Sequence, residues 1–377
     1  MKVLHVIVGL NVGGAELMLK RLIESQKNLP GYEHSVISLT GPGVIGPQLM
    51  EQGVRVRCLE MKGPFGLPRV FFQLWTEMRS LRPAIVQTWM YHSDLLGGLA
   101  ARAAGIRNLI WGIRTTDLEK GGKFTTRLIR KLCAYLSDKV PAKIVCAAEA
   151  SRQAHIAVGY DPQRMVVIPN GFDLSRLRTT VDQRRTLRSS LSLSEHHLVI
   201  GSLGRFNPVK DQANFIAATA MLAKLNPSLR FLMVGRDLTL ENEVLTTLLD
   251  RTGCSDRYIL LGERADAAVC LSAMDIFCLH SRTEGFPNVL GEAMAVGVPS
   301  VVTNVGDSAL LLGGHGIVVP AQDALALSCG LQRMIELSPE ERKLLSEKAK
   351  RRITDGFTME RSSRRFRQLY DDLSTPV

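Results

Sequence analysis

The chain has 377 residues, of which 45% are hydrophobic and 22% charged, and this balance excludes a disordered or fibrous protein. The length suits two domains of ordinary size. The formal net charge of +11 favours an anionic partner, such as a nucleotide or an acidic membrane surface. Nucleic acid is not indicated as a partner, because aromatic residues make up only 6% and no dense basic block occurs.

The seven cysteines are odd in number and form no C-x-x-C pair, which indicates reduced thiols rather than a disulfide framework or a zinc site. No apolar run reaches the roughly 18 residues of a membrane-spanning helix. The apolar stretch at the start is too short for a signal peptide. We therefore expect a cytoplasmic protein whose contact with a membrane would be peripheral, on the inner face.

Short apolar strands alternate with helices in the first part of the chain. The expected order is strand 2–9, helix 17–29, strands 34–40 and 83–89, helix 94–105, and strands 107–114, 143–148 and 165–171. This alternation predicts a parallel sheet that is covered by helices on both faces.

The alternation starts again after a polar stretch at 173–196, so a second α/β unit is joined to the first near 170–185. Its expected elements are strand 198–204, helix 211–225, strands 229–235, 257–263 and 274–281, a helix that begins near Pro287, and strand 299–304. A last amphipathic helix, 357–373, has Phe366, Leu369 and Tyr370 on one side, and by itself it would complete the second unit.

The first expected strand ends in a glycine turn, GLNVGGAE, before a helix. Gly13 and Gly14 would let the backbone come close to a ligand, which the N–H groups of the helix N-terminus would face. The turn is not G-x-G-x-x-G, so a dinucleotide is not indicated. The alternative is a plain strand–helix turn that needs both glycines for their φ angles.

The second unit opens with a strand that ends in GSLGRFNPVKD at 201–211. Arg205 and Lys210 follow that strand, and ligands of open parallel sheets bind outside the carboxyl ends of the strands. Two cations there can hold a diphosphate, the arginine through its fork and the lysine as a point charge. The alternative is a solvated loop with two ordinary cations.

The stretch SRTEGFPNVLGEAMAVGVP at 281–299 sets two acids around a turn at the start of a helix. Pro287 suits the first helical position, and the backbone N–H groups that follow can face an anion. Carboxylates accept hydrogen bonds from vicinal hydroxyls such as those of a sugar. The alternative is that both acids only favour the helix dipole. The candidate binding residues here are Glu284, Gly285, Phe286, Pro287, Asn288, Val289 and Glu292.

Taken together, these stretches resemble the family 4 retaining glycosyltransferases of bacterial surface-polysaccharide synthesis. Glu284 and Glu292 match the E-x7-E pattern of that family, and GGAE, IPNGFD, GRFNPVKD and FLMVG match its other blocks in order along nearly the whole chain. The resemblance implies a GT-B fold, with two Rossmann-like domains facing across a cleft. Residues 1–172 would bind the acceptor, 173–355 the nucleotide sugar, and the helix at 356–377 would cross back to the first domain.

The resemblance also implies roles in the transfer of a sugar from a nucleotide-diphosphate-sugar donor. Glu292 would bind the ribose and Glu284 the transferred sugar, while Arg205 and Lys210 would bind the diphosphate. Gly13 and Gly14 would approach the phosphates from the other domain. The base, of UDP or GDP, would be bound by loop groups near Glu263 and Arg264.

The same resemblance implies retention of configuration by front-face attack without a protein nucleophile, so that Glu284 positions the sugar. No Asp-x-Asp pair occurs in the chain. We therefore expect no required metal and no cofactor, since the donor is a substrate. The acceptor would be a glycan or a lipid-linked glycan in the synthesis of a surface polysaccharide or glycolipid. The alternative from another class is a non-catalytic protein of this fold that binds a nucleotide or a glycan.

For two residues of the first unit, the sequence allows either a functional or a purely structural role. His92 follows a strand, where the resemblance places a catalytic histidine near the transferred sugar or the acceptor; in the alternative, Ser93 or Asp94 caps the helix and His92 has no role in catalysis. Arg114 ends the next strand, and it would meet an acidic acceptor or a phosphate, or pair with Asp117.

A basic amphipathic segment lies at 119–143. A helix of this kind can lie on an anionic membrane leaflet, and the alternative is an ordinary surface helix with a buried core face. Its basic residues are Lys120, Lys123, Arg127, Arg130, Lys131, Lys139 and Lys143, and its apolar residues include Phe124, Leu128, Ile129, Leu132 and Tyr135.

Overall fold

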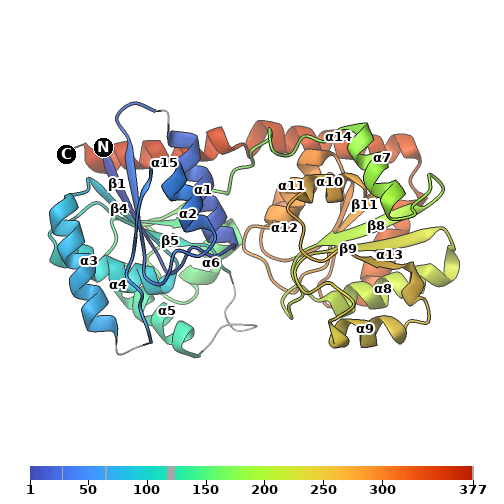
Figure 1. The fold of residues 1–377 in the computed structure, drawn as a ribbon, viewed down its shortest axis with the longest axis horizontal. Helices are drawn as coiled ribbons and strands as arrows, with labels where there is room; N and C mark the ends of the chain where they lie inside the picture. The colour runs from blue at the N-terminus through green and yellow to red at the C-terminus, as the bar shows by residue number, and fades with distance from the viewer. Residues whose placement is uncertain (28, 64–65, 117–123, 376–377) are drawn as a thin grey trace. The chain divides into compact units, whose positions relative to one another are not determined.

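The computed structural model describes residues 1–27, 29–63, 66–116 and 124–375, and these residues form two compact units (Figure 1). Unit 1 consists of Met1–Gly171 and Met359–Val377, and unit 2 of Phe172–Thr358. No described helix is both long enough and apolar enough to cross a membrane.

Unit 1 is built on one parallel sheet of seven strands in the order β3-β2-β1-β4-β5-β6-β7. The order of the strands reverses between β1 and β4, which makes this the switch point of the sheet, where a crevice opens at the carboxyl ends. The strands are β1 (Lys2–Ile7), β2 (Glu33–Ser38), β3 (Arg55–Cys58), β4 (Ile85–Trp89), β5 (Leu109–Ile113), β6 (Lys143–Cys146) and β7 (Met165–Val167).

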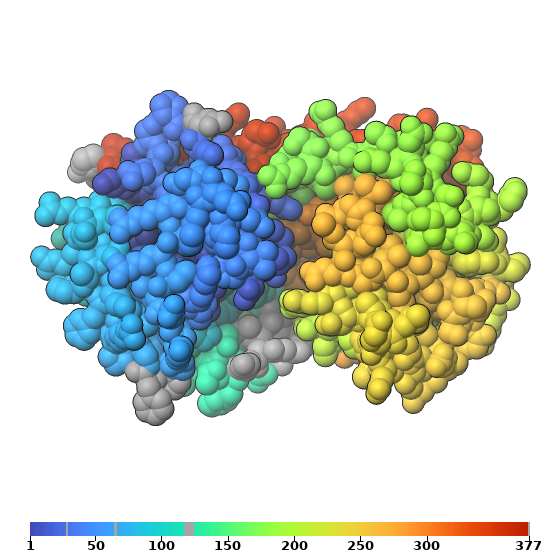
Figure 2. All heavy atoms as spheres, in the orientation of Figure 1, coloured from blue at the N-terminus to red at the C-terminus, as the bar shows by residue number. Residues whose placement is uncertain are grey.

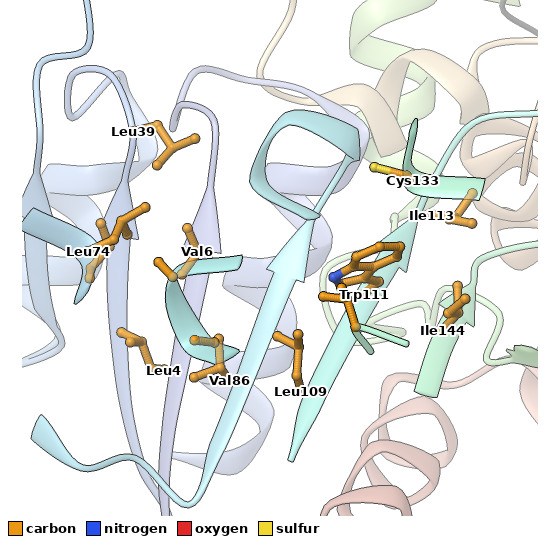
Figure 3. Packing of buried hydrophobic residues seen from close by; sticks show 14 of the residues in the cluster. Leu4, Val6, Leu39, Leu74, Val86, Leu109, Trp111, Ile113, Cys133 and Ile144 are labelled. Carbon is orange, nitrogen blue, oxygen red and sulfur yellow. The ribbon is translucent and has the colours of Figure 1, made fainter. Parts of the chain in front are cut away.

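Both faces of this sheet are buried, as the apolar strands predict. Leu4 and Val6 of β1 enter one core, and Val3 and Ile7 enter the other, because successive side chains of a strand point to opposite faces. Figure 3 shows the first core, in which Trp111 lies among aliphatic side chains. The first core is covered by α3 (Leu67–Leu81), α4 (Tyr91–Ala103) and α5 (Phe124–Leu136), and the second by α1 (Gly14–Gln26), α2 (Ile45–Glu51) and α15 (Met359–Ser374). A further helix, α6 (Glu149–Ile156), packs against β6 and β7.

Unit 2 repeats the plan with six parallel strands in the order β10-β9-β8-β11-β12-β13, and its switch point lies between β8 and β11. The strands are β8 (Leu198–Leu203), β9 (Leu229–Val234), β10 (Tyr258–Leu260), β11 (Ile276–Leu279), β12 (Ser300–Thr303) and β13 (Ile317–Val319). One face is covered by α8 (Gln212–Leu225), α9 (Glu243–Asp250) and α13 (Ala324–Glu336) (Figure 1). The other helices are α7 (Val181–Ser190), α10 (Ala267–Ser272), α11 (Asn288–Val296), α12 (Ser308–Leu312) and α14 (Pro339–Gly356), and a 3-10 turn spans Ser255–Arg257.

The sequence of the C-terminal helix alone suggested that it completes the second unit. This is wrong, because the helix belongs to unit 1. Phe366 and Tyr370 of α15 are fully buried in the core of unit 1, where this helix packs against α1 and β4. The polar stretch at 173–196 is also more than a connection. It holds α7, which is capped by Thr180 and is joined to the residue before β11, because Arg184 and Arg188 both bind Asp275.

Candidate functional site

The two central residues predicted for unit 2 meet at its switch point. Lys210 follows β8 and Glu284 follows β11, and the Lys210 Nζ lies 2.5 Å from the Glu284 Oε1. The same oxygen accepts a hydrogen bond of 2.6 Å from the Ser281 hydroxyl. The side chains of Lys210 and Glu284 keep exposed fractions of 24% and 11%, so this ion pair is partly shielded from water and still accessible.

His280, directly after β11, holds the loop that carries Lys210. The His280 Nδ1 lies 2.6 Å from the Lys210 carbonyl oxygen, and its ring stacks on Phe215 with centroids 4.8 Å apart. Because a carbonyl only accepts, Nδ1 carries the proton and donates it. Burial lowers the pKa of His280 to about 4, so the ring is neutral at neutral pH.

A second clamp joins the β8 and β11 loops, and sequence reasoning missed it. Asp211, directly after Lys210, has a left-handed backbone with φ of 57° and accepts a hydrogen bond of 2.8 Å from the Arg282 Nη2. The Arg282 N–H also donates to the Val209 carbonyl at 2.8 Å. The two loops that carry Lys210 and Glu284 are thus tied together on both sides of the ion pair. The only feature of the sequence that could have indicated this clamp is that Asp211 and Arg282 lie close to predicted site residues.

The backbone of Glu284 rests on the loop after β12. An ideal Cβ placed on Gly306 would lie 2.4 Å from the Glu284 carbonyl oxygen, and Gly306 has a positive φ of 53°. The Asp307 N–H donates to the Gly285 carbonyl at 3.1 Å. The loop therefore supports the Glu284–Gly285 backbone at a distance that only glycine allows.

The start of α11 differs in detail from the prediction. Pro287 is the N-cap residue, with ψ of 82°, and not the first helical residue. The Asn288 N–H donates to the Phe286 carbonyl at 3.0 Å, so it already has a partner. Phe286 is buried against Phe172, with ring centroids 6.0 Å apart. Of the predicted binding residues in this segment, Gly285, Asn288, Val289 and Glu292 are partly exposed.

The other charged residues predicted for this site are more exposed than Lys210 and Glu284. Arg205 follows β8 and is exposed, and its carbonyl oxygen accepts a hydrogen bond of 2.9 Å from the Gln212 side chain. Glu263 and Arg264 follow β10 and are also exposed. The Arg264 guanidinium makes two hydrogen bonds to Asp266, at 2.8 and 2.7 Å, which raise the pKa of Arg264 and lower that of Asp266.

The glycine turn of unit 1 lies at the switch point of its sheet, after β1. Gly13 is the N-cap of α1 with φ of −160°, which any residue adopts, and Gly14 is not among the glycines with positive φ. The structural alternative that both glycines are needed for their φ angles is therefore wrong. An ideal Cβ on Gly13 would lie 2.4 Å from Glu16 Oε2. The missing Cβ makes room for a carboxylate at the N-terminus of α1, where an anion is favoured.

His92 lies across the same switch point, at the start of α4. It is half-buried, and burial lowers its pKa. The predicted alternative of a cap by Ser93 or Asp94 is wrong. The N-cap is Met90, which has no side-chain cap and a φ of 73°, and Asp94 accepts hydrogen bonds from the Thr88 hydroxyl and the Gly112 N–H instead.

Arg114, at the end of β5, is held by neutral partners. Its Nη1 donates to the Asn170 side chain at 2.9 Å, and its guanidinium lies 4.6 Å from the centre of the Trp89 ring. Burial lowers the pKa of Arg114 to about 10. Its predicted alternative partner, Asp117, lies outside the described residues, as do Lys120 and Lys123 of the basic segment.

Among the residues that the structure describes, no group of three or more His, Cys, Asp or Glu side chains could hold a metal ion.

Two family models match the chain and together span most of it. The model "Glycosyltransferase Family 4" matches residues 12–176, and "Glycosyl transferases group 1" matches residues 197–336. An Escherichia coli UDP-Gal:alpha-D-GlcNAc-diphosphoundecaprenol alpha-1,3-galactosyltransferase is 26% identical over 77% of this chain and 75% of its own length. The putative glycosyltransferase EpsF of Bacillus subtilis is 25% identical over 80% and 79%.

Solved structures with the same fold cover both units. Anabaena HepE in complex with UDP has a TM-score of 0.87 at 20% identity, over 99% of this chain and all of the other. The same protein in complex with UDP-glucose has a TM-score of 0.84 at 22% identity, over 99% of each chain. WaaG, a glycosyltransferase involved in lipopolysaccharide biosynthesis, has a TM-score of 0.75 at 15% identity, over 99% of this chain and all of the other. At these identities the likeness concerns the fold, and it confirms the architecture expected from the sequence.

Proposed function

The chain belongs to the family 4 glycosyltransferases, with their GT-B fold, and on this premise we propose that it transfers a sugar from a UDP-sugar to a lipid-linked glycan with retention of configuration. The choice of UDP is supported by the UDP and UDP-glucose complexes of HepE and by the UDP-galactose donor in the name of the E. coli relative. That name also supports a sugar-diphosphate-lipid acceptor.

The observation that carries this proposal is the Lys210–Glu284 pair at the switch point of unit 2. Glu284 Oε1 accepts from both Lys210 and Ser281. We assign the second oxygen, Oε2, to the hydroxyls of the transferred sugar. Glu292, on the exposed part of the following helix, is assigned to the ribose hydroxyls. Carboxylates suit both tasks because they only accept and can take several hydrogen bonds.

The proposed role of Lys210 and Arg205 is to stabilise the charge on the leaving group. Departure of UDP builds negative charge on its β-phosphate, and preorganised positive groups stabilise that charge in the transition state. Lys210 is fixed by Glu284 and by the His280 contact to its carbonyl. Arg205, exposed on the same loop, adds a fork that fits phosphate oxygens.

We further propose that the acceptor hydroxyl attacks on the face from which UDP leaves, and that a phosphate oxygen takes the hydroxyl proton. Configuration is then retained without a protein nucleophile, and Glu284 positions the sugar. The charge on the leaving diphosphate is met by Lys210 and Arg205, so we propose that transfer proceeds without added metal. His92, with its pKa lowered by burial, is neutral at pH 7 and can accept a hydrogen bond from a sugar hydroxyl.

A lipid-linked acceptor places the reaction at the inner face of the membrane, so we propose a cytoplasmic protein that works at this surface. Unit 1 would bind the acceptor, with His92 at its switch point. Gly14 and the N-terminus of α1 would bind a phosphate group.

The proposal is tested by transfer from radiolabelled UDP-sugars to a water-soluble, short-chain sugar-diphosphate-lipid, in the presence of EDTA. We expect one UDP-sugar to be used, and an α-linked product by NMR if the donor is α-linked. The Glu284→Gln variant should bind UDP and lose transfer by about 100-fold or more, because it loses a charged acceptor in the transition state. Glu340→Gln, at an exposed acid of α14 in the same unit, tests whether any surface acid has the same effect.

The results also separate the alternative function. Binding of UDP-sugars without transfer in the wild type would favour the non-catalytic binding protein. A product of inverted configuration, or transfer that stops in EDTA and returns with a divalent metal, would overturn the mechanism. No binding of any UDP-sugar would overturn the choice of donor.

A further inference from the structure

We propose that α5 docks the protein on an anionic lipid surface through an apolar stripe that consists of Phe124, Leu128, Leu132 and Tyr135. This proposal rests on the proposed function in one respect, since a lipid-linked acceptor requires access to a membrane. The surface itself is argued from its exposure, its geometry and its charge.

The four residues of the apolar stripe are all exposed. Their exposed fractions are 80% for Phe124, 58% for Leu128, 44% for Leu132 and 70% for Tyr135. They recur at intervals of four, four and three residues, which places them along one side of a helix with 3.6 residues per turn. The outward side of α5 is therefore a continuous apolar surface. Figure 2 shows atoms of this part of the chain, in blue-green, at the surface.

The opposite side of α5 packs against the hydrophobic core of unit 1. Cys133 and Ala134 are buried in the core of unit 1, and Ile129 packs against that core. An ordinary surface helix has one apolar side of this kind and a polar side toward water. The alternative that 119–143 is such a helix does not account for α5, because here the side away from the core is apolar as well.

Basic residues border the apolar stripe. Between residues 124 and 143 the chain has five basic residues and one acid, Asp138. Lys131 is exposed next to Leu132, and the Lys139 Nζ lies 4.9 Å from the centre of the Tyr135 ring. An apolar helix side with lysines at its border is the pattern of a helix that lies in the plane of a membrane interface.

The charge also favours a lipid surface over a second copy of the chain. Two copies that met through their apolar stripes would bring the same lysines together, on a protein that already has a net charge of +11. Anionic headgroups would instead neutralise Lys131 and Lys139 while the acyl boundary takes up the apolar stripe. The occupant that suits both features is an anionic bilayer.

The test is co-sedimentation of the full chain with vesicles of phosphatidylcholine alone and with about one-third phosphatidylglycerol. We expect binding to the anionic vesicles that weakens at high salt. The Leu128→Ser, Leu132→Ser double variant should lower the partition coefficient by about tenfold or more, and Lys131→Glu should weaken binding to anionic vesicles only. The matched control is Leu225→Ser, Leu240→Ser, which changes two leucines of unit 2 with exposed fractions of 75% and 76%.

Transfer to the water-soluble acceptor is measured in parallel. The double variant of the apolar stripe should keep this activity and its melting temperature, because its leucines contact water and not the core. Wild-type protein that does not bind anionic vesicles, or a double variant that binds as wild type does, would overturn the proposal. A wild-type dimer that the double variant turns into a monomer would instead identify the stripe as an interface between copies. Vesicle binding without any transfer would refute the proposed function and leave the docking surface intact.

Discussion

A single methyl group at Gly306 should disable the site without unfolding the protein. In Gly306→Ala the new Cβ would lie 2.4 Å from the Glu284 carbonyl oxygen and 2.5 Å from the Gly285 carbonyl oxygen. Real Cβ atoms are essentially never closer than 3.0 Å to such atoms. The backbones of Gly306 and Glu284–Gly285 must therefore separate by at least about 0.6 Å, and we expect the Glu284 carboxylate to shift with its backbone.

The size of the effect follows from two separate terms. Alanine in a left-handed conformation costs roughly 1–2 kcal/mol of stability. A shift of a reacting group by about 1 Å can cost on the order of 100-fold in rate. We therefore expect kcat/KM for transfer to fall by about 30- to 100-fold in Gly306→Ala, while the lost stability stays small enough for the protein to remain folded at 25 °C.

Gly253→Ala is the matched control for this prediction. Gly253 also lies in unit 2, with φ of 69°, and an ideal Cβ there meets no atom within 4 Å. This variant has the same backbone strain without the steric clash, so it should lose stability in urea unfolding and keep its kcat/KM. Equal activity of the two variants would refute the reasoning, and so would a loss in Gly306→Ala that only matches its unfolded fraction.

Three further predictions test contacts on both units. Arg282→Ala removes the bond to Asp211 and should lower kcat about tenfold with little change in UDP affinity, and Arg282→Lys should restore part of kcat; an unchanged kcat in Arg282→Ala would contradict a positioning role. The pKa of His280 is lowered to about 4 by burial, so below pH 6.5 the unfolded state binds a proton that the folded state does not, and stability is lost as the pH falls. Between pH 7 and 5 this loss is about 2 kcal/mol, and urea unfolding of His280→Gln should lack it; equal pH dependence in both proteins would exclude the buried neutral ring as the cause. Arg114→Lys keeps the charge and loses the planar contact with Trp89, so urea unfolding should show a loss of about 1–2 kcal/mol, and no loss would show that the stacking is energetically neutral.

Strand positions in both units were predictable, because strands buried on both faces of a parallel sheet are apolar runs with clear ends. The positions of Lys210 and Glu284 at strand ends followed from the same pattern. Their contact did not, because it requires β8 and β11 to be neighbours in the sheet. The chain between them contains β9 and β10, which lie on the other side of β8. Strand order is a property of the whole sheet, and local patterns do not encode it.

The sequence-based predictions were wrong or incomplete where one residue type or one pattern fits more than one structure. Gly13 was expected either to admit a ligand or to take a positive φ, and the structure shows an extended φ with a carboxylate in the space of the missing Cβ. Pro287 suits both an N-cap and a first helical position, which differ by one residue. The amphipathic pattern of α15 shows that one side is buried, but it does not show against which unit. Each question is decided by tertiary contacts.

In the proposed mechanism, Lys210 at the centre of the site would connect the two halves of the donor. An ammonium group has three donors, and one of those of Lys210 is used by Glu284 Oε1. Two remain for phosphate oxygens, so one side chain can contact the leaving diphosphate and the acid that we assign to the sugar. A shift in either partner would then change the other, so the orientation of the sugar relative to the leaving diphosphate would depend on contacts within the protein. This coupling explains why the clamps at Asp211, His280 and Gly306 all converge on the two loops that carry this pair, and why changes there should affect the rate of transfer more than the affinity for UDP.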